Sequence, residues 1–147
     1  MLLHIDLESR SECDLVKHGI EHYARDPTTE IMCMAYVFGP EETIQSWTPG
    51  EPPVDRINDH IRGGGRCIAW NDSFESKMWT HILVPRHGFA EVQPDNWLDA
   101  PVFARALGFP SALGKASAAP MFGDAFGKDM AGHRLMMKLC KPAGGAR

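Results

Sequence analysis

The chain has 147 residues, of which 44% are hydrophobic and 23% are charged. These values fit one ordinary folded domain and exclude a disordered chain, a collagen-like repeat and a disulfide-rich miniprotein. The formal net charge of −4 argues against a protein that binds nucleic acid through overall basicity, and it leaves room for a local basic face or an acidic metal pocket.

In chain order we expect a strand at residues 2–7, a helix at 11–26, strands at 31–38 and 43–48, a helix at 54–62, a strand at 66–70, and helices at 73–83, 97–107, 111–119 and 130–140. Residues 84–88 are expected to form a turn and residues 120–129 a loop. This order predicts one mixed α/β domain over residues 1–142, followed by a flexible tail at 143–147.

The N-terminus, the hydropathy of the chain and the cysteine spacing indicate the cellular compartment of the protein. No apolar stretch reaches 18 residues, so we expect no membrane span, and the N-terminus lacks the pattern of a signal peptide. The cysteines show neither a CxxC motif nor a zinc-ligand spacing, and we interpret them as small apolar residues: Cys13, Cys33, Cys67 and Cys140. These observations predict a reducing, cytoplasmic compartment.

Two carboxylates stand near the end of the first expected strand. Asp6 and Glu8 are two residues apart, so their side chains lie on the same face of a strand. Acids held this close repel each other unless a cation lies between them, and Mg²⁺ or Mn²⁺ prefer such oxygen ligands. The alternative interpretation is an exposed strand end with two solvated acids.

A second polar cluster, Asn-Asp-Ser-Phe-Glu at residues 71–75, follows the strand at 66–70. It places Asn71 at a strand end and Glu75 in the first turn of a helix, where Glu75 would join Asp6 and Glu8 around metal ions. The alternative is that Asp72 or Ser73 caps the helix and that Glu75 only favours the positive end of the helix dipole.

Residues 3–11, Leu-His-Ile-Asp-Leu-Glu-Ser-Arg-Ser, resemble the first motif of DEDD-type 3′–5′ exonucleases. Residues 69–75 resemble their second motif, Asn-x-x-Phe followed by a carboxylate, which is Glu75 here and most often Asp in the superfamily. The sequence is most similar to the proofreading domain of bacteriophage family A DNA polymerases. The similarity extends through residues 26–31, 82–89, 104–108 and 128–142.

The resemblance implies a ribonuclease H-like fold and cleavage of DNA 3′ ends to nucleoside monophosphates. Asp6, Glu8 and Glu75 would be the catalytic carboxylates and would bind two Mg²⁺ or Mn²⁺ ions about 4 Å apart. Asn71 and Phe74 would line the substrate channel, where stacking on an aromatic ring tolerates any base.

The family's third motif, a Tyr or His followed four or five residues later by an Asp, has no counterpart before Arg147. We therefore expect a truncated chain, half of a split polymerase gene, or a stand-alone relative with a rebuilt site. Asp129 is the candidate fourth metal ligand, with Asp124 and His133 as further local candidates; all three also fit a solvated loop and helix start. A polymerase subunit or a second copy of the chain could supply the missing helix.

The C-terminal part of the chain is basic, and Arg134 and Lys138 share one face of the last expected helix. We interpret both as substrate-binding residues; a solvated helix face explains the pattern equally well. The function predicted is a metal-dependent 3′–5′ DNA exonuclease. The alternatives are a non-catalytic DNA-binding or polymerase-docking remnant, and a nuclease of other polarity or with an RNA substrate.

Overall fold

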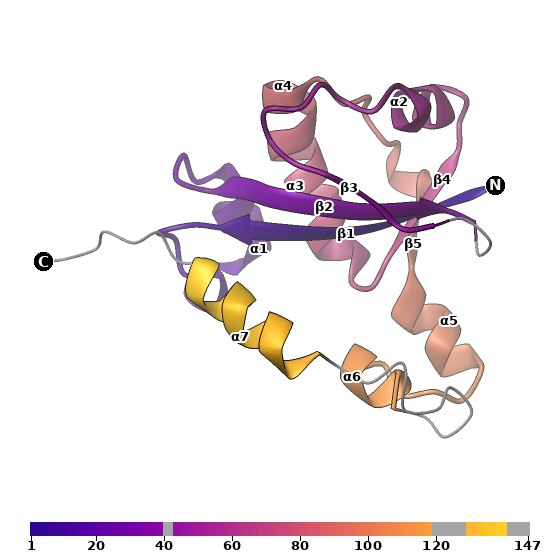
Figure 1. Cartoon of the computed structure of the whole chain (residues 1–147). Helices are drawn as coiled ribbons and strands as arrows, with labels where there is room; N and C mark the ends of the chain where they lie inside the picture. The colour runs from indigo at the N-terminus through magenta and orange to yellow at the C-terminus, as the bar shows by residue number, and fades with distance from the viewer. Residues whose placement is uncertain (40–42, 119–128, 141–147) are drawn as a thin grey trace, which may run out of the picture.

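A mixed five-stranded sheet forms the centre of the computed structural model, which describes residues 1–39, 43–118 and 129–140 (Figure 1). Its strands are β1 (Leu2–Arg10), β2 (Glu30–Phe38), β3 (Gln45–Trp47), β4 (Arg66–Ala69) and β5 (Trp97–Asp99). The strand order is β3-β2-β1-β4-β5; β2 is antiparallel to β1 and β3, whereas β4 is parallel to both β1 and β5. The predicted α/β, ribonuclease H-like fold is confirmed.

Helices cover both sides of this sheet. They are α1 (Leu15–Arg25), α2 (Asp55–Arg62), α3 (Asp72–Met78), α4 (Val84–His87), α5 (Ala100–Ala106), α6 (Leu113–Ala116) and α7 (Met130–Leu139). A π-helical turn, Trp79–Leu83, joins α3 to α4, and a 3₁₀ turn, Pro94–Asn96, precedes β5. In Figure 1, α2 and α4 lie on one side of the sheet and α5, α6 and α7 on the other. Over the described ranges, no helix has the length and apolarity to cross a bilayer.

The alternation of side chains along β1 separates the core from a polar face. Leu3, Ile5 and Leu7 are buried, whereas His4 and Asp6 are exposed. The buried side joins a core whose largest fully buried side chains include Trp47 and Trp79, both packed against one aromatic ring, that of Phe89. The opposite side of β1 is therefore free to carry polar groups.

The prediction of a helix at residues 97–107 is wrong for its first three residues, which form a strand. Trp97, Leu98 and Asp99 form β5 by pairing with Cys67, Ile68 and Ala69 of β4. Helix α5 begins only afterwards, with Pro101 in its first turn, where a missing N–H costs nothing. Pairing with a neighbouring strand, which the local sequence does not reveal, decides the conformation of these three residues.

The expected turn at residues 84–88 is also different in the structure. Residues Val84–His87 form a single helical turn, α4, which Gly88 ends with a left-handed φ of 73°. Except for Asp129, the expected loop at 120–129 lies outside the described residues, and so do the expected tail at 143–147 and the boundary after residue 142.

Candidate active site

The unequal lengths of β1 and β4 create the candidate site. The parallel pairing runs only from Leu2–Arg66 to His4–Ile68, and β4 ends at Ala69. Strand β1 continues to Arg10, so its edge beyond His4 is open on this side. Helix α3 begins close to this edge, and it brings Glu75 beside β1, where the Leu7 backbone amide acts to lower the pKa of the Glu75 carboxyl group.

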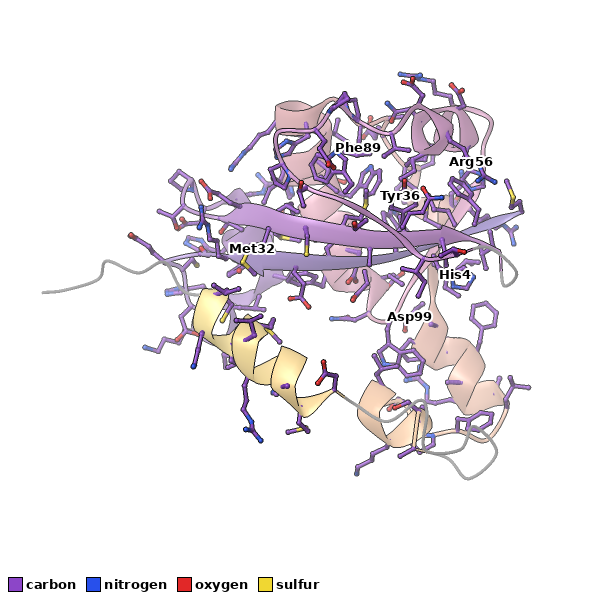
Figure 2. The ribbon with its side chains drawn as sticks, in the orientation of Figure 1. His4, Met32, Tyr36, Arg56, Phe89 and Asp99 are labelled. Atoms are coloured by element: carbon purple, nitrogen blue, oxygen red, sulfur yellow. The ribbon has the colours of Figure 1, made fainter. Side chains whose placement is uncertain are left out.

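Asp6 and Glu8 point to the face of β1 that does not form the core. Figure 2 shows His4, two residues before Asp6, on the opposite side of the sheet from Tyr36 and Phe89. Partial burial raises the pKa of Asp6, although its side chain is exposed. Burial and then the nearby Asp6 carboxylate raise the pKa of Glu8. As predicted, the two acids share one face.

Glu75 is the most perturbed of the three acids. Its side chain is 5% exposed, and its Oε2 atom is buried without a hydrogen-bond partner among the described residues. Burial, and to a lesser degree the Asp6 and Asp72 carboxylates, raise the pKa of Glu75 to about 8, although backbone amides partly oppose the shift. Leaving a buried carboxylate oxygen without a partner is costly, so this site favours a proton or a cation.

The three predicted acids are thus in electrostatic contact through Asp6, which raises the pKa of both Glu8 and Glu75. They are not gathered as tightly as a single-ion cluster: within the described ranges, their ligand atoms do not all lie within 4.8 Å of one another.

Asn71 connects β4 to α3 in a strained conformation. Its φ of 134° is the one positive φ at a non-glycine residue in the described parts of the chain. Its carbonyl accepts a hydrogen bond from the Phe74 N–H, and its side chain is exposed and makes no cap hydrogen bond. Strain of this kind costs on the order of 1–3 kcal/mol and is concentrated at functional sites in proteins.

A largely apolar groove of about 520 Å³ opens beside Glu8. It receives side chains from β1, α1, α3 and α7 and from the turn after β1, namely Leu7, Glu8, Ser9, Ser11, Cys13, Asp14, Leu15, Val16, Tyr23, Phe74, Met136, Met137 and Cys140. Phe74 is half-buried, with its ring centroid 6.4 Å from that of Tyr23. Glu8 is therefore reached along a path lined by aromatic and aliphatic groups.

Two of the three C-terminal candidates lie among the described residues, and neither Asp129 nor His133 makes a hydrogen bond or ion pair there with Asp6, Glu8 or Glu75. Asp129 is exposed and caps α7, where its Oδ1 accepts a hydrogen bond from the Ala131 N–H at 2.9 Å. It is not among the groups that shift the pKa values of the three acids. His133 lies half-buried on α7, and Asp124 lies outside the described residues.

Arg134 and Lys138 are exposed on α7, as expected for a basic face. At 100° per residue they lie roughly 160° around the helix from Met136, but Arg134 is only roughly 60° and Lys138 roughly 100° from Met137, and both methionines line the groove. Lys138 therefore points mostly away from the groove, whereas Arg134 lies nearer its margin. Neither basic residue is among those that line it.

Sequence reasoning missed Asp99, the last residue of β5. The Asp72 N–H donates to Asp99 Oδ1 at 3.4 Å, and the Asp99 charge contributes to a raised pKa of Asp72, after burial. Figure 2 shows Asp99 where β5 passes into α5. The carboxyl ends of the parallel strands β1, β4 and β5 share one edge of the sheet, so recognising β5 would have revealed this acid.

A buried polar network fixes the end of β1 that carries Glu8. The Ser9 and Tyr23 hydroxyls are 3.0 Å apart, and the Thr29 hydroxyl contacts Ser11 Oγ at 2.7 Å and the Tyr23 carbonyl at 2.6 Å. Arg86 donates to the Thr29 carbonyl at 2.8 Å. These bonds connect β1, α1 and the start of β2, and they hold the strand end in place.

We expect Tyr23→Phe to destabilise the protein by about 1–2 kcal/mol, because it leaves the buried Ser9 hydroxyl without its partner. Urea denaturation followed by tryptophan fluorescence measures the change. The matched control is Tyr36→Phe, which removes a hydrogen bond to the exposed Gln45 and should cost less. Equal losses in the two variants would contradict a special role for the network.

No family model matches the sequence. Among curated proteins, the chain is similar to a DNA polymerase of Bacillus phage SP02, with 30% identity over 146 residues. The chain is related to a segment of a phage DNA polymerase. The match covers 95% of this chain and 21% of the polymerase, so the chain spans about a fifth of that relative's length.

Proposed function

We propose that this polymerase-related segment is a divalent-metal-dependent 3′–5′ DNA exonuclease of the proofreading type. The observation that carries the proposal is the buried Glu75 carboxylate, whose Oε2 has no hydrogen-bond partner in the part of the chain that the structure describes and which interacts electrostatically with Asp6. A helix that buries Glu75 near the Asp6 and Asp72 carboxylates gains no stability from doing so, and this makes a role in binding cations the better explanation.

The residues present fit Mg²⁺ or Mn²⁺. Asp6, Glu8 and Glu75 supply only hard carboxylate oxygens, which these ions prefer. The unpartnered Glu75 Oε2 and the repulsion that raises the pKa values of Glu8 and Glu75 are both relieved by positive charge. When bound, a pair of such ions supplies an activated water and stabilises charge on the leaving 3′-oxygen.

The remaining roles fall to the chain's own side chains. Asp6, Glu8 and Glu75 hold the positive charge at the open edge of β1. Phe74, in the groove that leads to Glu8, offers a ring on which a terminal base stacks without regard to sequence. The exposed Asn71 amide is held by its strained turn in position to hydrogen-bond a sugar or phosphate of the strand.

DNA is the proposed substrate because the similar phage protein is a DNA polymerase. The proposed partners are DNA 3′ ends, Mg²⁺ or Mn²⁺, and either a polymerase subunit or a second copy of the chain. The alternative, a non-catalytic DNA-binding or polymerase-docking remnant, is favoured by one observation: Asp129, the candidate fourth ligand, is engaged as the cap of α7.

Cleavage of a 5′-labelled single-stranded DNA oligonucleotide, in Mg²⁺ and separately in Mn²⁺, distinguishes these functions. An exonuclease acting from the 3′ end gives a descending ladder of labelled products. Failure to cleave in either metal, even at high protein concentration, would refute an autonomous exonuclease and support the remnant. A 3′-labelled strand and an RNA strand run in parallel identify an enzyme of other polarity or substrate.

The orientation of α7 leads to a prediction about Arg134 and Lys138. Because neither residue lines the groove, replacing both with Gln should weaken single-stranded DNA binding only through lost long-range attraction, on the order of 2–5-fold at low salt and little at 0.5 M salt. Fluorescence anisotropy in EDTA measures the affinities. The control is Arg62→Gln with Arg66→Gln, exposed residues near the opposite end of β1.

Direct phosphate contacts would give a different result. Each lost contact to a single strand lowers the slope of log affinity against log salt by about 0.7, so two contacts change it by about 1.4. A change of that size in the Arg134→Gln, Lys138→Gln double variant would show that these residues bind substrate directly, although neither lines the groove.

A further inference from the structure

A second group of metal-ligating side chains lies outside the acidic site. Cys13 follows β1 in the turn before α1, His22 lies on the second half of α1, and Asp26 directly follows that helix. One ligand atom from each residue lies within 4.8 Å of the other two. The spacing of the cysteines predicts no zinc site, so this cluster is a product of the fold.

The local structure explains how the three side chains meet. Gly19 interrupts α1 with a φ of 76° and a ψ of 166°, so the helix is kinked between its first and second halves. His22 and Asp26 are four residues apart, which places them on neighbouring turns. The Cys13 N–H donates a hydrogen bond to Ser11 Oγ at 2.9 Å, and this bond holds the turn that carries Cys13.

We propose that Cys13, His22 and Asp26 form a Zn²⁺-binding site. A thiolate, an imidazole and a carboxylate are the three ligand types that zinc takes in proteins, whereas Mg²⁺ and Ca²⁺ do not prefer sulfur. Tetrahedral zinc bonds of 2.0–2.3 Å place ligand atoms roughly 3.3–3.7 Å apart. A cluster already within 4.8 Å needs only small side-chain rotations to reach this geometry.

The surroundings of Asp26 resemble those of an oriented ligand. Its Oδ1 accepts hydrogen bonds from the Thr28 N–H at 2.9 Å and from the Thr28 hydroxyl at 2.6 Å. Both bonds use the same oxygen, so they fix the carboxylate and leave Oδ2 to face a metal. Partners of this kind orient ligands in known metal sites.

His18 offers a fourth ligand. Its ring centroid is 5.2 Å from that of His22, and both histidines act electrostatically on Asp26. His18 is exposed and free to rotate toward the cluster. With His18 the site would be a closed, four-ligand site of the structural type, and without it water would occupy the fourth position.

The position of the cluster suggests what the ion stabilises. Cys13 also lines the apolar groove beside Glu8, and the Ser11 N–H donates to the Cys140 carbonyl at 3.1 Å, which connects the same turn to the end of α7. Zinc would therefore fasten α1 to the turn after β1 and hold one wall of the groove. This proposal does not depend on the exonuclease proposal.

Isothermal titration of the metal-free, tag-free 147-residue chain with ZnCl₂ tests the proposal, with excess Mg²⁺ present to occupy the acidic site. We expect one zinc ion per chain and a rise in Tm of roughly 5–15 °C at zinc about 100-fold above Kd. Cys13→Ser and His22→Ala should each weaken zinc binding by at least tenfold. His22 is exposed, so its variant should fold normally.

Cys33→Ser is the matched control, because Cys33 is also half-buried and lies near Asp6 and Glu8. This variant should bind zinc as the unchanged chain does. Cobalt(II) titration adds a spectroscopic check, since a thiolate ligand gives a charge-transfer absorption that Cys13→Ser should abolish. The absence of stoichiometric binding, or a loss of binding in Cys33→Ser instead of Cys13→Ser, would overturn the proposal.

Discussion

Replacing Asp6 by Ala should lower the rate of DNA cleavage by at least about 1,000-fold, equivalent to about 4 kcal/mol of transition-state stabilisation. Asp6 is the acid that links the other two, since its charge raises the pKa of both Glu8 and Glu75. Its loss removes the shared member of the proposed metal site. Quantifying the ladder of a 5′-labelled oligonucleotide in Mn²⁺ measures the effect.

The structure supplies a control for this experiment. Asp6 is exposed and outside the hydrophobic core, so Asp6→Ala should fold and melt like the unchanged chain. Asp95→Ala removes another exposed carboxylate, in the 3₁₀ turn before β5, and should leave cleavage unchanged. If Asp6→Ala retained a tenth or more of the cleavage activity, the nuclease activity would not depend on this site.

Local sequence patterns predict the elements that carry Asp6, Glu8 and Glu75. Alternation along β1 places Asp6 and Glu8 on one face whatever the rest of the fold does, because side chains alternate in every strand. Glu75 follows a short strand by a few residues, so chain connectivity alone keeps it near the end of β4. The sequence pattern does not show that β4 ends before β1 does. This difference in length leaves room for Glu75 beside Leu7.

Features that depend on distant pairing could not be predicted in this way. The three residues of β5 are too few to show a period of two, and they are strand only because β4 lies beside them. Missing β5 also concealed Asp99. The Cys13–His22–Asp26 cluster depends on the kink at Gly19 and on the turn before α1, which bring residues of ordinary spacing within reach of each other.

The metal-free chain should lose stability as the pH rises from about 4.5 to about 8, and Glu75→Gln should remove much of that loss. Burial raises the pKa of Glu75 to about 8 in the folded state, whereas the unfolded chain has the ordinary value of 4.5. Between these values the unfolded state releases a proton that the folded state retains, so stability falls with rising pH. Above pH 8 the full penalty persists, on the order of 3–5 kcal/mol.

Urea denaturation in EDTA at pH 5 and pH 8.5 measures this effect, and the exposed Glu91→Gln is the control. The Glu75→Gln variant and the unchanged chain should be close in stability at pH 5, and the variant should be more stable at pH 8.5, because Gln carries no charge to bury. Saturating Mn²⁺ should narrow the gap by stabilising only the chain that retains the Glu75 carboxylate. If Glu75→Gln were less stable than the unchanged chain at pH 8.5 in EDTA, the buried Glu75 carboxylate would stabilise the fold as a hydrogen-bond acceptor. It would then not be a cation ligand that destabilises the fold when no metal is bound.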